Sequence, residues 1–189
     1  MLDDRKIFII SAPSATGKDA VATELLKTDL PLERMLTATS RPRRSTDREN
    51  DYHFLTEAEF RRLIDSGGMI EWVEFNQHLY GTRWQDLRAI VEAGKSPIMD
   101  IDVRGARSFK QKFPTQAVTI FLVPDSLDVL RRRLEERGTA KADIVDRLNT
   151  AQGELKLKDS FDYQVVNRDG YLDNAVRQVA EIIRGELAK

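Results

Sequence analysis

The chain has 189 residues, with 30 Lys and Arg against 31 Asp and Glu, so its formal net charge is −1. At about 150 residues per domain this length predicts a single domain, and 41% hydrophobic with 32% charged residues suits a soluble globule. The near-neutral charge argues against a dedicated nucleic-acid binder, and the absence of cysteine excludes disulfides, Cys-based zinc sites and thiol nucleophiles.

Membrane and export signals are not expected either. The sequence has no run of about 18 apolar residues, the length that a membrane-spanning helix needs. Residues 1–6 are mostly charged and lead into only a short apolar run, which is unlike a secretory signal. We therefore expect a cytoplasmic protein without a membrane partner.

Short apolar runs alternate with helical stretches along the chain. Strands are expected at 7–10, 96–102, 118–123 and 163–167. Helices are expected at 20–26, 57–66, 127–137 and 172–187. Unbroken apolar strands between helices predict an α/β fold with a parallel sheet and helices on both faces. The polar, Arg- and Thr-rich stretch 37–83 predicts an insertion between core elements.

Ligands of such sheets bind at the carboxyl ends of the strands, so the turns after Ile10, Asp102 and Val123 are the expected places for chemistry. The first of these turns resembles a phosphate-binding loop, G-x-x-x-x-G-K-[ST], between a strand and a helix. It comprises Ala12, Pro13, Ser14, Ala15, Thr16, Gly17, Lys18 and Asp19. Backbone N–H groups of such a loop bind phosphate oxygens, and its lysine neutralises them. The open alternative is an ordinary strand–turn–helix junction.

Two positions of this loop depart from the pattern. Ala12 replaces the first glycine, which would cost about 1 kcal/mol if that position requires a positive φ. Asp19 replaces the Ser or Thr whose hydroxyl usually contacts Mg²⁺. Its carboxylate can bind Mg²⁺, but it also places a negative charge near the phosphates. A metal ion or basic groups must therefore lie between them.

Two carboxylates follow the strand expected at 96–102. Alternation along a strand would place Asp100 and Asp102 on the same side. Opposite a phosphate loop, an acid at such a strand end holds Mg²⁺ directly or through water. The alternative for either residue is a helix cap or a turn.

Arginines form two groups in the sequence. One group comprises Arg41, Arg43, Arg44 and Arg48. The other comprises Arg131, Arg132, Arg133, Arg137 and Arg147. Arginine is suited to bidentate phosphate binding and to stabilising a transferring phosphoryl group. Two such groups and one phosphate loop indicate two phosphorylated ligands, although solvated helix faces are the preferred interpretation for Arg131 and Arg132.

Several short blocks resemble those of guanylate kinases, members of the P-loop nucleoside monophosphate kinases. They include Thr37–Arg44, with two arginines three apart, D-Y-x-F at 51–54, I-E-W at 70–72, Y-G-T at 80–82 and M-D-I-D-V-R-G at 99–105. Later blocks at 130–138, 147–148, 154–155 and 165–167 follow in the same order. The loop differs from the family's G-P-S-G-x-G-K-S/T at Ala12, Ala15 and Asp19. The resemblance covers nearly the whole chain.

The resemblance implies a P-loop NTPase-type core at 1–36, 91–125 and 156–189. It further implies a GMP-binding subdomain inserted at about 37–90 and a helical lid at about 126–155. The implied reaction is transfer of the γ-phosphate of ATP to GMP with Mg²⁺ as cofactor. ATP and GMP would be the partners, without a nucleic acid, and the oligomeric state is open.

Residue roles follow from the resemblance. The GMP phosphate would be held by Arg41, Arg44, Tyr52 and Tyr80. Guanine would be read by the acceptors Glu71 and Asp102, with Thr37, Gly81 and Thr82 completing the site. The transferring phosphoryl group would be stabilised by Lys18, Arg44, Arg137 and Arg147. Mg²⁺ would be held by Asp19 and Asp100, and Asn167 would lie near adenine.

Two other functions stay open at this point. One is a binding module on the same fold that has lost catalysis. The other is a kinase for a different phosphorylated acceptor, such as a sugar bisphosphate, since the related kinases share the G-K-D ending seen in Gly17, Lys18 and Asp19.

Overall fold

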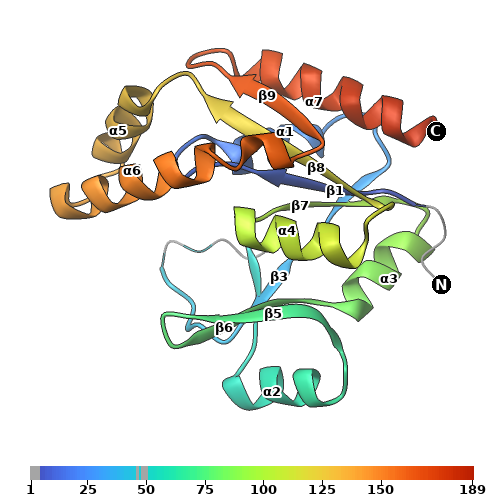
Figure 1. The fold of residues 1–189 in the computed structure, drawn as a ribbon. Coiled ribbons are helices and arrows are strands. Elements are labelled where there is room, and N and C mark those ends of the chain that lie inside the picture. The colour runs from blue at the N-terminus through green and yellow to red at the C-terminus, as the bar shows by residue number, and fades with distance from the viewer. Residues whose placement is uncertain (1–4, 46, 48–50) are drawn as a thin grey trace.

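The larger of two sheets forms the core of the computed structural model, which describes residues 5–45, 47 and 51–189 (Figure 1). It has five strands in the order β2-β7-β1-β8-β9, and every pairing is parallel. The strands are β1 (Ile7–Ser11), β2 (Leu32–Arg34), β7 (Ser96–Asp100), β8 (Ala117–Pro124) and β9 (Tyr163–Asn167). The sequence-based prediction of a parallel α/β sheet is confirmed.

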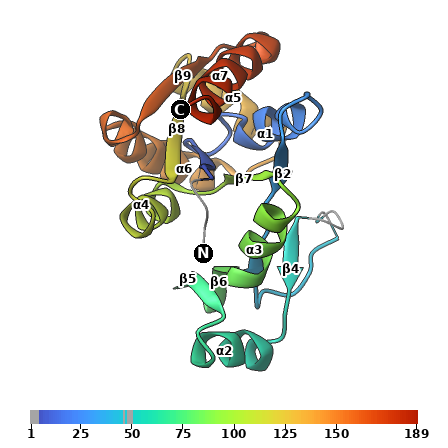
Figure 2. The ribbon, with the colours of Figure 1, turned by 90° about the vertical axis from the view of Figure 1, so that its right-hand side faces the viewer.

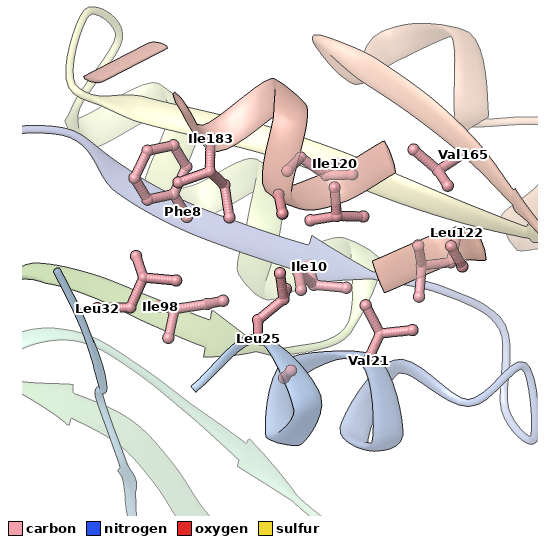
Figure 3. Packing of buried hydrophobic residues seen from close by; sticks show 14 of the residues in the cluster. Phe8, Ile10, Val21, Leu25, Leu32, Ile98, Ile120, Leu122, Val165 and Ile183 are labelled. Carbon is pink, nitrogen blue, oxygen red and sulfur yellow. The ribbon is translucent and has the colours of Figure 1, made fainter. Parts of the chain in front are cut away.

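Helices cover both faces of this sheet, as predicted. Strand β1 is apolar at both phases of its alternation, so it is buried on both sides. Phe8 and Ile10 pack against α1 (Lys18–Leu25) and α7 (Leu172–Leu187) (Figure 3). On the other face, Ile7 and Ile9 pack with α3 (Trp84–Glu92) and α4 (Val103–Lys112).

The polar stretch predicted as an insertion builds the second sheet. Its four strands run in the order β4-β3-β6-β5. They are β3 (Thr37–Thr39), β4 (Tyr52–Phe54), β5 (Met69–Phe75) and β6 (His78–Arg83). Helix α2 (Glu57–Asp65) begins with a capping box between Thr56 and Glu59 and packs Phe60 against this sheet. Figures 1 and 2 show this unit beside the core rather than on a face of the larger sheet.

Two further helices follow β8. Helices α5 (Leu127–Glu136) and α6 (Lys141–Leu155) pack on each other through Leu130, Leu134, Ile144 and Leu148. The short 3₁₀ helix η1 (Lys158–Ser160) then leads to β9. None of the helices in the described part of the chain is both long and apolar enough to cross a bilayer.

One predicted strand ends earlier than expected. The sequence placed residues 96–102 in a strand, but β7 ends at Asp100. Asp102 instead caps α4, because its side chain accepts a 2.7 Å hydrogen bond from the Gly105 N–H. The prediction that Asp100 and Asp102 alternate within one strand was therefore wrong, and the helix-cap alternative holds for Asp102.

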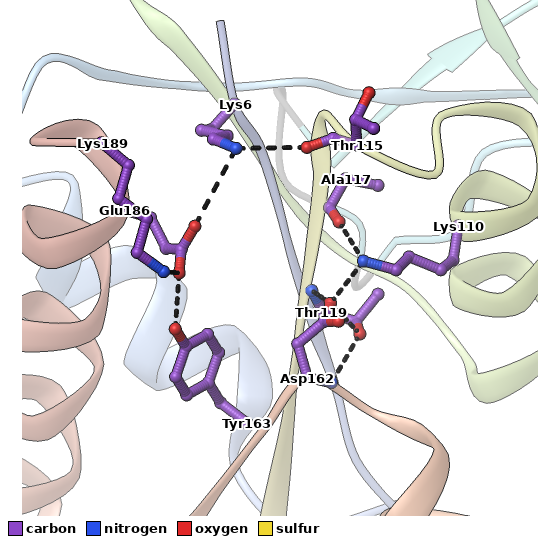
Figure 4. A network of polar contacts seen from close by, with 9 residues as sticks. All are labelled: Lys6, Lys110, Thr115, Ala117, Thr119, Asp162, Tyr163, Glu186 and Lys189. Carbon is purple, nitrogen blue, oxygen red and sulfur yellow. Dashed lines mark hydrogen bonds and ion pairs between the residues drawn. The ribbon is translucent and has the colours of Figure 1, made fainter.

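A polar network near the amino ends of the core strands connects helices α4 and α7 to strands β8 and β9 (Figure 4). Asp162 accepts hydrogen bonds from Lys110 of α4 at 2.9 Å and from the Thr119 backbone of β8 at 2.8 Å. Glu186 near the end of α7 accepts from Tyr163 and Lys189. These contacts fix α4 and α7 relative to the strands, whose carboxyl ends lie away from this network and face the candidate site.

Candidate active site

The loop at residues 12–17 connects β1 directly to α1, as predicted. Gly17 has φ 99°, and a Cβ there would lie 3.0 Å from the Asn167 side-chain nitrogen, so glycine is required. Ala12 is buried and does not have a positive φ, so replacing glycine there costs no backbone strain. Ala15 has φ 65° instead, an unfavourable conformation for a residue with a side chain.

Three side chains from distant elements hold this loop. Asn167 donates a 2.7 Å hydrogen bond to the Thr16 carbonyl, and Arg133 donates to the same carbonyl at 3.0 Å. Arg147 of α6 lies 3.0 Å from the Ser14 hydroxyl. The Ala15 methyl packs among the apolar side chains of α5 and α6. The loop conformation is therefore coupled to the two helices that follow β8.

A cavity of about 450 Å³ lies beside this loop on the side of α5 and α7. Its lining includes Gly17, Arg133, Arg137, Asn167 and Arg168. Of the arginines in the second sequence group, Arg133, Arg137 and Arg147 thus lie near the loop. Arg132 instead pairs with Asp169 and Glu136 in an exposed ion-pair network. This agrees with the preferred interpretation that Arg132 belongs to a solvated helix face.

A second cavity, of about 380 Å³, lies on the other side of the loop lysine. It brings Lys18 together with Arg41 and Arg44 of the inserted segment. Its other lining residues include Asp19, Arg34, Thr37, Asp47, Tyr52 and Asp100. Lys18 and the arginines from the first sequence group therefore share one concave, strongly polar space.

Arg41 is the most deeply buried arginine of this cavity, with 7% of its surface exposed. Asp47 binds it in a bidentate pair at 2.9 and 3.0 Å and also accepts from the Arg44 backbone N–H at 2.6 Å. The hydrogen bonds from Arg41 lower the pKa of Asp47 to about 2. The Arg41 guanidinium also lies 5.4 Å from the Tyr52 ring centre. Arg48, predicted in the same group, lies outside the described residues.

Tyr52 and Tyr80 lie together next to this arginine. Their ring centres are 6.4 Å apart in an edge-to-face arrangement. Burial raises the pKa of the Tyr52 hydroxyl, which therefore stays protonated and can donate a hydrogen bond near neutral pH.

Glu71 of β5 lies beside Thr82 of β6, because the two residues are cross-strand partners. The Thr82 hydroxyl donates a 2.8 Å hydrogen bond to Glu71 Oε1. Burial raises the pKa of Glu71, and the nearby charge of Asp102 raises it further. A Cβ on Gly81 would lie 2.4 Å from the Glu71 carbonyl oxygen, so only glycine fits there.

Asp19 and Asp100 both lie near the guanidinium of Arg34 at the carboxyl end of the core sheet. Arg34 Nη1 lies 3.1 Å from Asp19 Oδ1, and Nη2 lies 3.9 Å from Asp100 Oδ1. Burial raises the pKa of Asp100, while the charges of Arg34 and Lys18 oppose that rise. Two hard oxygen donors that converge on one cationic centre, beside a phosphate loop, fit Mg²⁺, which keeps its remaining ligands as water and substrate phosphate.

Three residues of the site carried no role in the sequence-based reasoning. Arg34 ends a three-residue strand and belongs to no motif. Arg133 was only one member of an arginine group. Burial and the charge of Asp102 raise the pKa of Glu154, and the nearby charge of Lys18 opposes that rise. Glu154 lies about two helical turns beyond Arg147 on α6, and the only sequence signal for it was the block at 154–155, to which no role was given.

Comparison with known proteins agrees with this geometry. The guanylate kinase family model matches residues 4–186. Guanylate kinase from Thermotoga maritima is 39% identical over 186 residues, covering 97% of this chain and 88% of that protein. The enzyme from Nitrosomonas europaea is 36% identical, covering 97% and 90%.

Comparison with a solved structure also indicates the guanylate kinase family. The crystal structure of guanylate kinase from Anaplasma phagocytophilum superposes with a TM-score of 0.77 at 30% identity, covering 98% of this chain and 87% of that one. The chain is similar to these enzymes over nearly its full length, and its phosphate-loop lysine shares a cavity with two arginines of the inserted segment. This protein therefore belongs to the guanylate kinase family.

Proposed function

We propose that this protein transfers the γ-phosphate of ATP to GMP and releases ADP and GDP. The observation that carries the proposal is the shared cavity of Lys18, Arg41 and Arg44. Cations from two separate parts of the chain face one space there, as a reaction between two anionic phosphates requires. Family membership supports the same reaction.

GMP would occupy the cavity between the two sheets. Its phosphate would bind Arg41 and Arg44, with hydroxyl donors from Tyr52 and Tyr80. Asp47, which now pairs with Arg41, would give up part of that contact to the phosphate. The phosphate is already an anionic nucleophile, so the site needs no strong general base.

Guanine would be recognised by acceptors. The N1–H and amino groups of guanine are donors, whereas adenine offers an acceptor at N1. Glu71 and Asp102 would accept these donors, with Thr37, Gly81 and Thr82 completing the pocket. Because Asp102 Oδ1 already caps α4, we expect Oδ2, which lies 3.4 Å from Arg104 Nη2, to make this contact.

ATP would bind along the loop Ala12, Pro13, Ser14, Ala15, Thr16, Gly17, Lys18 and Asp19. Adenine would enter the cavity that Asn167 lines, on the side of α5 and α7. Backbone N–H groups at the start of α1 would bind the phosphate chain. Lys18 lines the other cavity and would reach the oxygens of the γ-phosphate.

Transfer would break the bond between the γ-phosphorus and its bridging oxygen as the GMP oxygen bonds to that phosphorus. Lys18, Arg44, Arg137 and Arg147 would stabilise the charge on the transferring group. Asp19 and Asp100 would hold Mg²⁺, which when bound supplies electrostatic neutralisation of the phosphate oxygens. Positioning and charge account for most of the rate enhancement in such reactions.

We further propose that the chain divides into moving parts. The core would comprise residues 1–36, 91–125 and 156–189, the GMP-binding subdomain about 37–90, and the lid about 126–155. The hydrogen bond from Arg147 to Ser14 supports a lid that closes on the loop. Closure would exclude water and limit wasteful hydrolysis of ATP. The protein would work in the cytoplasm on free nucleotides, without a nucleic acid.

A coupled assay that records ADP tests the proposal. With ATP, Mg²⁺ and a panel of acceptors, we expect rapid ADP formation only with guanine nucleotide monophosphates, and loss of the rate when EDTA removes the metal. No ADP with GMP would indicate a binding module. Faster turnover of a sugar bisphosphate than of GMP would indicate the other acceptor class. Either result would overturn the proposed function.

A further inference from the structure

The last residue of the phosphate loop is a carboxylate, and an arginine of the core sheet forms an ion pair with it. Asp19 stands in the first turn of α1, directly after the loop lysine. Arg34 is the last residue of β2, which pairs with β7, and β7 ends at Asp100. The strand order therefore brings one guanidinium to two carboxylates that are far apart in the sequence.

The contacts of Arg34 are directed at this pair. Nη1 lies 3.1 Å from Asp19 Oδ1, and Nη2 lies 3.1 Å from the Thr23 hydroxyl and 3.9 Å from Asp100 Oδ1. Only 20% of the Arg34 side chain is exposed. Nε is buried and, among the described residues, has no hydrogen-bond partner. Nearly all polar contacts of this side chain are thus made through its two terminal nitrogens, to α1 and to the acid pair.

The charge balance of the site needs such a cation. Asp19 and Asp100 lie beside the same loop that would bind the negatively charged ATP phosphates, and Asp100 is itself mostly buried. Two carboxylates and a phosphate chain repel one another strongly in a partly buried site. Lys18 also faces Asp100, but it lines the acceptor cavity and would be engaged by phosphate. Arg34 is the positive group of β2 that contacts both acids.

We propose that Arg34 is a positioning residue for the acid pair, acting as a resident cation between Asp19 and Asp100. It neutralises the pair in the nucleotide-free protein and thereby permits a carboxylate at the last loop position. It also keeps divalent metal from binding the acid pair alone, so the metal is bound together with ATP. The inference rests on the proposed function only for the identity of the nucleotide.

Manganese binding tests this without any turnover. In electron paramagnetic resonance of the nucleotide-free protein, the free Mn²⁺ signal reports how much metal the chain binds. Arg34→Met removes the guanidinium that contacts both carboxylates and so makes the acid pair more negative, and we therefore expect Mn²⁺ affinity to rise at least about tenfold. In Arg34→Met/Asp19→Ser one carboxylate is gone, and the rise should disappear. Arg34→Lys keeps the charge and should stay close to the wild type.

ATP affinity in EDTA, measured by calorimetry, is the second readout. Arg34→Met should weaken metal-free ATP binding at least about tenfold, because Asp19 then repels the phosphates. The added Asp19→Ser change should restore most of that loss. Such non-additivity shows that the two residues act as a pair. Both readouts stand even if the protein does not phosphorylate GMP, so failure of the proposed function and failure of this inference are distinguishable.

The matched control is Arg184→Met, which breaks the exposed ion pair that Arg184 of α7 makes with Asp29, away from the site. It should change neither Mn²⁺ nor ATP binding. Circular dichroism checks folding, and Arg34→Gln, which keeps polar groups but removes the charge, replaces Arg34→Met if that variant unfolds. Unchanged Mn²⁺ affinity in the charge-removing variants, or an ATP defect that Asp19→Ser does not relieve, would overturn the inference.

Discussion

The carboxylate of Glu71 offers the sharpest test of base recognition. Its Oε1 accepts the Thr82 hydroxyl proton at 2.8 Å, which leaves Oε2 for a donor on the ligand. Glu71→Gln keeps the size of the side chain and removes its charge. The oxygen of the new amide would keep the contact with Thr82, so its NH₂ group would face the donors of guanine.

The size of the effect follows from that geometry. A hydrogen bond to a charged group contributes about 1.5–3 kcal/mol, which corresponds to a rise in KM for GMP of about 10- to 150-fold. KM for ATP should change little, because Glu71 lies on β5 of the inserted sheet, whereas ATP would bind along the loop between β1 and α1. Since the base is held similarly before and during transfer, kcat should fall much less than KM rises.

Steady-state rates with GMP and ATP varied separately provide the measurement. The control is Glu74→Gln, an exposed acid on the same strand, which should leave both KM values unchanged. A KM for GMP within about twofold of the wild type in Glu71→Gln, against the 10-fold minimum expected from a lost charged hydrogen bond, would refute the base-reading role.

The remaining predictions concern pH, the lid and packing. Burial raises the pKa of Glu71, and base binding needs the charged form of this carboxylate. GMP affinity measured by calorimetry should therefore fall as the pH is lowered toward that raised pKa. Glu71→Gln should remove this pH dependence. Arg147→Met removes the contact with Ser14 and should lower kcat about 100-fold in the coupled assay with KM for GMP nearly unchanged; a change in KM alone would contradict a role in transfer. Gly81→Ala places a Cβ against the Glu71 carbonyl and should lower the free energy of unfolding in urea by about 1–3 kcal/mol. Its control, Gly185→Ala, meets open space in α7 and should raise it by about 0.5–1 kcal/mol.

The core elements were predictable because their signals are local. Strand β9 and helix α7 have the residues expected from the sequence, 163–167 and 172–187. Apolar runs and helical spacing depend on the backbone repeat of a single segment. The phosphate loop was equally visible, since its strand–turn–helix context and the Gly17 and Lys18 pair are contiguous. The sequence left open whether the Ala12 position requires a positive φ; in the structure Ala15 and Gly17 have a positive φ, and Ala12 does not.

The strand boundary at Asp100 shows where local reasoning fails. Alternation alone cannot distinguish two more strand residues from a turn and a helix cap. The hydrogen bond from Gly105 to Asp102 decides the matter, because satisfying an N–H at the start of α4 outweighs extension of a strand. The consequence for the site is that Asp102 is fixed by a helix rather than by the sheet.

The sequence by itself determined the parallel α/β core, the presence of an insertion between core elements and the residue types for two phosphorylated ligands. Only the tertiary structure decided that Arg34 meets Asp19 and Asp100, that Asp47 pairs with Arg41, and that Ala15 packs against α5 and α6. The physical reason is that periodicity and turn chemistry act over a few neighbouring residues. The meeting of Arg34 with Asp100 depends on β2 lying beside β7, and no pattern within either segment encodes that strand order.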